Sequence, residues 1–379
     1  MTFSRISIFT FSLVFLVTAA VWGVYLSSPR AVDAVGAAPL VITTVATNRH
    51  NPRGLNFGPD GALYVAEAGG DGTPTSQCGV MGDGSTKCYS TTGTITRIDL
   101  AANQAERIVK GLPSLIAPNG VATGATGIHD ISFDAQGNAF MSIGLGGNPK
   151  WRFGYFGAEG ASFARLGTFT LNGRFKLNDD LGRYESVANP DRNVPDSNPY
   201  GIVAQFEKVA YADAGGNALN LVTKNGVIST LAVFPDRVIT RPDGTMVSVQ
   251  AVPTSVALGP DGNYYVGQLT GGPFTVGVAN VYLVPAGGGT PVVAQSGFTN
   301  IIDIAFGPDG SMYVLEIARN AIPNFNPGRL VRVAPDGTRT EIAAGLLIAP
   351  GGVVVRGGSI YVTNRSTSST IGEVLKIDP

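Results

Sequence analysis

Charged side chains and histidines are scarce in this sequence. Of its 379 residues 14% are charged, two are histidine, and the formal net charge is −1. Proteins that bind nucleic acids cluster Lys and Arg to neutralise phosphates, and no basic stretch occurs here. The composition therefore argues against a nucleic-acid partner.

The sequence also lacks the short motifs that identify common reactions. It contains no nucleophile elbow, no P-loop, no dinucleotide-binding glycine fingerprint and no zinc-protease motif. No motif identifies a reaction, so the candidate functional residues are those polar residues that the fold would bring together.

Glycine, proline and apolar residues are plentiful. There are 51 Gly and 24 Pro, and 44% of the residues are hydrophobic. Many turn residues between short apolar runs are typical of sandwiches, barrels and propellers, and closed β architectures often run long as one domain. The composition predicts a single all-β domain with a sizeable core.

The N-terminal segment has the order of regions found in secretory signals. Arg5 precedes the uncharged apolar run Ile6–Leu26, and small residues follow. The run is also long enough for an uncleaved membrane anchor. We predict that 1–37 is a signal peptide or anchor and that 38–379 is one exported domain. Its location would be secreted, periplasmic or cell envelope, with membrane contact only through that anchor.

Two cysteines, Cys78 and Cys88, flank a short loop. In an oxidising compartment such a close pair forms a disulfide. A metal site is the rival interpretation, but two cysteines without a nearby histidine support it weakly.

One unit recurs along the chain: an apolar strand, a Gly-Pro-Asp-Gly-like turn and a second strand carrying Tyr or Phe. Asp-Gly between alternating strands predicts a hairpin, because Gly accepts the positive φ of the turn. In the first strand large and small residues alternate, which suits sheets that pack radially. The copies are Gly54–Val65, Ile131–Met141, Ile202–Ala212, Val256–Val266, Ile304–Val314 and Val353–Val362.

Two further apolar strands follow each copy except the last, and repeats of roughly 45–60 residues with four strands are typical of propeller blades. The last copy lacks a fourth strand, whereas Leu40–Thr47 is a strand without a partner of its own. We therefore predict a six-bladed β-propeller of four-stranded blades, closed by the N-terminal strand joining the last blade, which removes exposed sheet edges.

Aligning the copies predicts a polar ring at one mouth of the channel. The second strands end at Glu67, Ile143, Asp213, Gln268, Glu316 and Asn364. The first strands begin near Arg53, His129-Asp130, Tyr200, Thr254 and Asp303. Since the two inner strands run antiparallel, both sets are expected at the same mouth.

Several carboxylates in one mouth repel one another unless water, a cation or raised pKa values relieve the repulsion. Ca²⁺ or another divalent cation would suit Glu67, Asp213 and Glu316, and His129 would make a transition metal reasonable. The alternative is a water-filled channel lining. Candidate acid/base residues are Glu67, His129, Asp130, Asp303 and Glu316, and candidate ligand-binding residues are Arg53, Tyr200, Gln268 and Asn364.

Two long segments leave the repeat. Gly144–Ala164 carries Trp151 and Tyr155 among other aromatics, so it is either an aromatic cover for a ligand or a loop packing its own core. Asp179–Tyr200 is rich in Asp, Asn and Pro and could bind Ca²⁺, but its irregular ligand spacing favours a plain loop.

Several stretches resemble the ScyD/ScyE family of exported bacterial propellers, over nearly all of 38–379. The resembling stretches are Tyr184-Glu185, Asn189–Asp191, Asp196–Gly201, Ala212–Asn217, Val252–Ala257, Tyr264–Gly271, Gly297–Asp303 and Tyr313–Glu316. The resemblance implies a periplasmic or extracellular protein. Namesake members are associated with oxidative assembly of the aromatic pigment scytonemin, but most relatives have no assigned function. Gln268 stands where relatives often have an acid, which weakens the acidic ring.

Together these observations predict an exported propeller that binds, and in an enzyme version transforms, a small aromatic molecule at a carboxylate-lined mouth. A Ca²⁺-dependent lactonase-type hydrolase is the enzyme version. The alternative is a non-catalytic scaffold that recognises a protein or a cell-envelope polymer.

Overall fold

The computed structural model describes residues 40–241, 243–325 and 327–379. The predicted signal peptide or anchor, 1–37, lies outside them. Within the described residues, no helix combines the length and hydrophobicity needed to cross a membrane.

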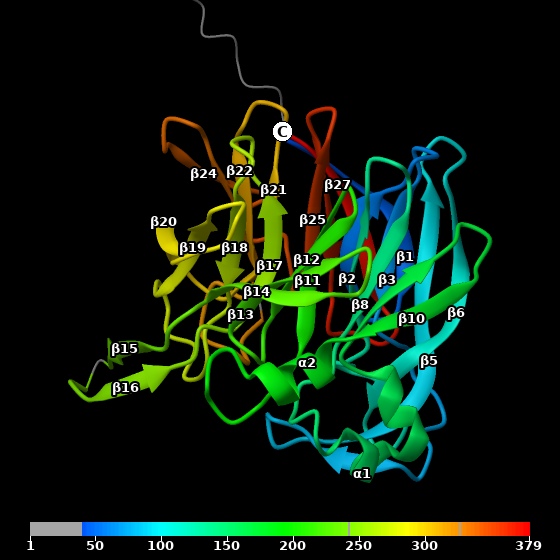
Figure 1. Ribbon diagram of the computed structural model, residues 1–379. Coiled ribbons are helices and arrows are strands. Elements are labelled where there is room, and N and C mark those ends of the chain that lie inside the picture. The colour runs from blue at the N-terminus through cyan, green and yellow to red at the C-terminus, as the bar shows by residue number, and fades with distance from the viewer. Residues whose placement is uncertain (1–39, 242, 326) are drawn as a thin grey trace, which may run out of the picture. The chain divides into compact units, whose positions relative to one another are not determined.

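The described chain forms six antiparallel blades of four strands each around a central channel, which confirms the predicted propeller (Figure 1). The first strands, next to the channel, are β2 (Pro52–Phe57), β7 (Ile128–Phe133), β11 (Pro199–Gln205), β17 (Pro253–Leu258), β21 (Ile301–Phe306) and β25 (Gly352–Arg356). The second strands are β3 (Leu63–Glu67), β8 (Ala139–Ile143), β12 (Lys208–Asp213), β18 (Tyr264–Gln268), β22 (Met312–Glu316) and β26 (Ser359–Asn364).

The outer strands complete each blade. The third strands are β5 (Thr86–Asp99), β9 (Arg165–Phe169), β13 (Ala218–Thr223), β19 (Ala279–Val284), β23 (Arg329–Val333) and β27 (Gly372–Asp378). The fourth strands are β6 (Gln104–Ile116), β10 (Phe175–Asp180), β14 (Ile228–Val233), β20 (Val292–Phe298), β24 (Arg339–Ile342) and, for the sixth blade, β1 (Val41–Arg49). Strand β1 pairs with β27, with Val41 opposite Asp378, so the two ends of the described chain share one blade.

The repeated Tyr and Phe pack neighbouring blades together. A Tyr on a second strand meets a Phe on a first strand edge to face at three interfaces. Ring centroids are 5.1 Å apart for Tyr64–Phe133, 5.0 Å for Tyr265–Phe306 and 5.1 Å for Tyr361–Phe57. Such pairs add about 0.5–1.5 kcal/mol beyond the area they bury. The aromatic positions of the motif therefore form the core between blades.

The two ends of the propeller differ in their connections. At one end, the turn face, short turns such as Gly58–Gly61 join first and second strands, and Gly61 has φ +79°. At the other end, the loop face, lie the longer connections with their extra elements (Figure 1). These elements are β4 (Cys78–Val80), α1 (Arg152–Phe156), the 3₁₀ helix η1 (Gly157–Ser162), α2 (Leu181–Ala188), β15 (Arg237–Thr240) and β16 (Met246–Val249).

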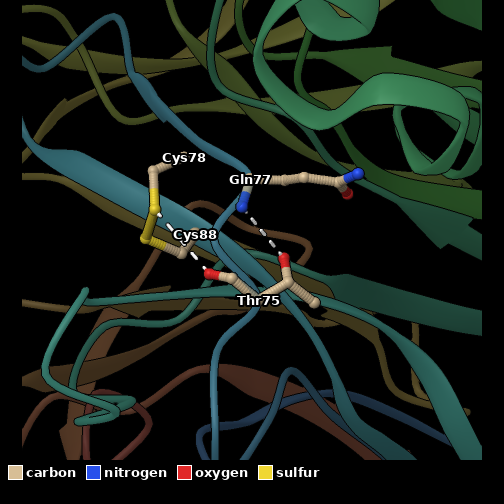
Figure 2. The surroundings of a disulfide bond; sticks show 4 residues. All are labelled: Thr75, Gln77, Cys78 and Cys88. Carbon is tan, nitrogen blue, oxygen red and sulfur yellow. Dashed lines mark hydrogen bonds between the residues drawn. A yellow bond between two sulfur atoms is a disulfide. The ribbon is translucent and has the colours of Figure 1, made fainter.

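The predicted disulfide is present. Cys78 on β4 lies directly opposite Cys88 on β5 in the antiparallel ladder, and their sulfur atoms are bonded (Figure 2). Next to it the backbone N–H of Gln77 donates to the Thr75 hydroxyl at 3.2 Å. The disulfide therefore fastens a short extra strand of the loop face to the first blade.

Candidate functional site in the central channel

The polar residues at the ends of the second strands anchor loops of their own blades. In four blades the side-chain oxygen accepts the backbone N–H of a residue that precedes the first strand. The bonds are His50 N to Glu67 at 2.7 Å, Asn198 N to Asp213 at 2.7 Å, Thr299 N to Glu316 at 2.9 Å and Ile348 N to Asn364 at 2.8 Å. Gln268 instead accepts from Asn280 N at 3.2 Å and from Arg237 at 3.4 Å.

Glu67 is the most strongly held of these residues. It is fully buried and forms ion pairs with Arg49 at 3.2 Å and Arg107 at 3.0 Å. The hydroxyl of Thr96 donates to the same carboxylate. Because two cations and several donors occupy both oxygens, Glu67 is placed as a structural anchor.

The expected metal ring is therefore not formed. Glu67, Asp213 and Glu316 each turn into the loops of their own blade and do not share a coordination sphere. Among residues 40–241, 243–325 and 327–379, no three His, Cys, Asp or Glu side chains are grouped to hold a metal ion. The physical reason is that each side chain accepts a backbone N–H of its own blade, and Glu67 and Glu316 also pair with arginines.

The polar residues of the first strands do converge on the axis, because small residues there let the blades approach closely. A Cβ atom on Gly54 would lie 1.9 Å from Asp130 Oδ1, and one on Gly352 would lie 2.9 Å from Gly54 Cα. Side chains then bridge neighbouring blades: Thr254 Oγ1 donates to Ile301 O at 2.7 Å.

Asp130 and Asp303 are equivalent residues in the second and fifth blades, on opposite sides of the six-bladed ring. Asp130 Oδ1 accepts from Ile131 N and Oδ2 from Ile202 N, both at 2.8 Å. Asp303 Oδ1 accepts from Ile304 N at 2.8 Å and Oδ2 from Val353 N at 2.7 Å. Each carboxyl thus bridges its own strand and the first strand of the next blade.

Both carboxyls line a cavity of about 230 Å³ in the channel. Its other lining residues come from all six first strands and are mostly apolar, including Leu55, Ile202 and Phe306. A few convergent polar groups in an otherwise apolar cavity are the usual composition of a small-molecule site. The volume of this cavity is below the usual range of drug-sized ligand sites.

The two carboxyls hold protons more tightly than ordinary aspartates. Burial, reinforced by the charge of Asp303, raises the pKa of Asp130 well above its usual range. Burial raises the pKa of Asp303 to about 7. Within the described part of the chain neither has a Lys or Arg ion-pair partner. The pair therefore stays protonated to a higher pH than ordinary aspartates do.

Arg53, His129 and Tyr200 form a layer at the loop-face end of the first strands and do not line this cavity. The His129 ring stacks on Tyr200 with centroids 4.2 Å apart, and its Nδ1 donates to Pro199 O at 3.1 Å. Burial and the nearby charge of Arg53 lower the pKa of His129 to about 3. His129 is therefore neutral, so it orients a neighbour rather than exchanging a proton.

The aromatic segment 144–164 packs against the first two blades. Phe156 and Phe163 are fully buried in the core of the first two blades, and Tyr155 lies against Gly79. Trp151 is 55% exposed, and neither it nor Tyr155 lines the channel cavity. The structure therefore does not bring these two candidate ligand-binding residues to Asp130 and Asp303.

A second group of acids was not assigned a role from the sequence. Glu185, Asp191 and Asp196 surround Asp213 beside the turn Gly215–Asn217. Two signals pointed there: the Asp- and Asn-rich composition of 179–200, and the stretches that resemble the ScyD/ScyE family. The irregular spacing concealed the cluster, because its members come from α2, the loop that follows it and β12.

No protein-family model matches the chain, and no curated protein matches it significantly. Similar solved structures include a protein of unknown function from Bacteroides thetaiotaomicron, with TM-score 0.56, 8% identity and coverage of 90% of this chain and 76% of that one. A gluconolactonase from Xanthomonas campestris has TM-score 0.51, 9% identity and coverage of 89% of each chain. An auxiliary nutrient binding protein from Bacteroides thetaiotaomicron has TM-score 0.50, 9% identity and coverage of 90% and 77%.

At these identities the likeness shows the fold alone. Fold and comparisons together define the class as a six-bladed β-propeller.

Proposed function

We propose that this chain is an exported propeller that binds a small molecule in its central channel and moves a proton on it with the Asp130–Asp303 pair. The observation that carries the proposal is the placement of these carboxyls: opposite blades deliver them to one cavity without a countercharge. Export is supported by the signal-like N-terminus and by the disulfide.

The pair provides an acid and a base in one site. Two coupled carboxyls with raised pKa values share protons, so one donates while the other accepts. Whichever carboxyl of the pair is protonated is the acid, and the other, when ionised, is the base. A reaction that needs both, such as opening an ester or lactone by water, matches this arrangement.

The channel pair does not fit a divalent cation well. Every carboxylate oxygen of the pair already accepts a backbone N–H, and no third acidic or histidine ligand joins them among the described residues. The proposed proton transfer therefore uses only the two carboxyls. The aromatic character of the ligand is supported only by the ScyD/ScyE resemblance.

The test is ligand binding by the full chain. Esters, lactones and phenols are screened by thermal shift, and hits are compared in Asp303→Asn, Asp130→Asn and the control Asp336→Asn. Asp336 is an exposed turn residue whose bond to Thr338 N an Asn preserves. We expect both channel variants to weaken binding at least about tenfold and to abolish turnover. A hit that binds all variants equally would place the site elsewhere.

A scaffold without catalysis is the second candidate, and one observation favours it. The loop face exposes large apolar side chains, including Trp151, Phe153, Val187 and Val194. Exposed apolar residues of this kind are common at protein contacts. Under this alternative, substitutions at Trp151 and Phe153 abolish partner capture, whereas Asp303→Asn leaves capture unchanged.

A further inference from the structure

The corner where α2 meets the third blade concentrates four carboxyls around a glycine turn. A Cβ atom on Gly216 would lie 2.8 Å from Glu185 Oε2 and 3.4 Å from Asp213 Cγ, and one on Gly215 would lie 2.6 Å from Asp196 Oδ1. The fourth acid, Asp191, accepts from the Asn217 amide at 2.9 Å. The two glycines thus leave a cradle that any other residue would fill.

These carboxyls lack the arginine partners that other acids have at the ends of the second strands. At the end of the second strand Glu67 is paired with two arginines, and Glu316 has Arg329 at 3.6 Å. Asp213 occupies the same position in its blade. Across the described ranges, no Lys or Arg forms an ion pair with it or with its three acidic neighbours, Glu185, Asp191 and Asp196. The fold places up to four negative charges together without a cation of its own.

Oxygen atoms here are buried without partners, which is an independent sign of a ligand. Glu185 is 2% exposed, and its Oε1 has no hydrogen-bond partner. Asp196 Oδ1 and Asn189 Oδ1 are likewise buried and unpartnered. An unsatisfied buried acceptor is destabilising unless something occupies it, and buried carboxylates are normally paired or bound to metal. By contrast, the Asp213 oxygens accept from three backbone N–H groups and the Ser197 hydroxyl.

We propose that this corner binds Ca²⁺, with Glu185 and Asp196 as carboxylate ligands and Asn189 Oδ1 as an amide ligand. Ca²⁺ takes six to eight oxygens at flexible geometry, so backbone carbonyls and water complete the shell. Asp191 and Asp213, whose oxygens already accept hydrogen bonds, add negative charge. The site lies outside the channel and goes beyond the proposed function: the cation ties α2 and the following loop to the third blade.

The same burial and crowding raise the pKa values of two of these carboxyls. Burial and then the charges of Asp213, Asp191 and Asp196 raise the pKa of Glu185 to about 8. Burial, followed by the charge of Asp213, raises the pKa of Asp196 to about 6.

The experiment titrates Ca²⁺ into the chelator-treated full chain by calorimetry, at pH 8. We expect wild-type binding at or below about 1 mM, as in extracellular modules. Glu185→Gln and Asp196→Asn should each weaken it by about ten- to a hundredfold. The control is Glu207→Gln, an exposed acid at the opposite end of the same blade that pairs with Lys224. Asp303→Asn should leave Ca²⁺ affinity unchanged, which separates this site from the channel.

A second measurement can be made even if the Glu185→Gln and Asp196→Asn variants do not fold. Tyr211 is fully buried, and the charges of Asp213 and Glu185 act on its hydroxyl. Tb³⁺ bound at the corner should therefore show tyrosine-sensitised emission that Ca²⁺ displaces, and Tyr211→Phe should lower the emission while Ca²⁺ affinity stays the same. Absence of Ca²⁺ binding to the wild type at about 1 mM, or equal affinity in both ligand variants and wild type, would overturn the proposal.

Discussion

Glu67 in the first blade and the Asp130–Asp303 pair in the channel are carboxyls enclosed by the same fold, and they differ in how their charge is compensated. Glu67 meets Arg49 and Arg107 together with hydrogen-bond donors. The channel pair meets only backbone N–H groups and each other. Enclosure alone therefore does not distinguish an anchor from a reactive group.

The difference shows where chemistry can occur in this propeller. The charge of a buried carboxylate beside two arginines is compensated, and removing one partner leaves charges uncompensated. A carboxyl pair without a cation keeps protons at neutral pH and can exchange them with a ligand. Glu67, at the end of the second strand of the first blade, is therefore a structural residue, whereas the channel pair is the place where we propose proton transfer.

The largest expected effect on stability comes from removing the Glu67 carboxylate, whose charge two arginines compensate. Glu67→Gln leaves Arg49 and Arg107 without their carboxylate in a buried site, so it should lower the free energy of unfolding by about 3–5 kcal/mol. Urea unfolding at pH 8 measures it. The matched control is Glu207→Gln, which breaks an exposed pair and should change stability by about 1 kcal/mol or less. Equal losses in the two variants would remove the distinction between buried and exposed acids.

Most of the fold was predictable because its signals are local. The Asp-Gly turns, the alternation in the first strands and the Tyr/Phe positions lie within about ten residues of one another in each copy. The closing strand β1 followed from counting strands, since one blade lacked its fourth and one strand lacked a partner.

The candidate site was predictable only in part. Asp130 and Asp303 hold equivalent positions on their first strands, and both line one cavity. The structural role of Glu67 could not be predicted from the sequence, because Arg107 is 40 residues away in the sequence and reaches it from the outer strand β6. The acids around Asp213 were missed for the same reason: their approach is set by packing, not by spacing.

The next effect tests whether close approach of the blades positions the channel pair. In Gly54→Ala the new Cβ would lie 1.9 Å from Asp130 Oδ1, so the Asp130 side chain or the strand has to move. We expect a loss of about 1–3 kcal/mol of stability and weaker ligand binding. Gly287→Ala is the control, since nothing lies within 4 Å of its Cβ position. An unchanged Gly54→Ala protein would mean that the channel tolerates a wider Asp130 position.

The pH dependence of the free energy of unfolding should distinguish Asp303 in the channel from Glu67. The pKa of Asp303 is about 7 in the folded chain, against 3.8 for an ordinary aspartate, so the folded state binds more protons between these values. Its contribution is fully present below about pH 4 and is lost as the pH rises through about 7. Asp303→Asn should flatten this decline and be more stable than wild type at pH 8, the opposite sign to Glu67→Gln. Urea unfolding from about pH 4 to 8 measures both slopes.

The smallest effect is expected at Glu316, which occupies the position of Glu67 in the fifth blade. Burial raises the pKa of Glu316 to about 7 despite its bond from Thr299 N and the charge of Arg329 at 3.6 Å. Gln can still accept from Thr299 N, and an amide removes the unfavourable ionisation, so Glu316→Gln should change stability by about 1 kcal/mol or less at pH 8. If instead it is as destabilising as Glu67→Gln in the same urea series, the number and closeness of arginines do not decide how a buried acid of this propeller behaves.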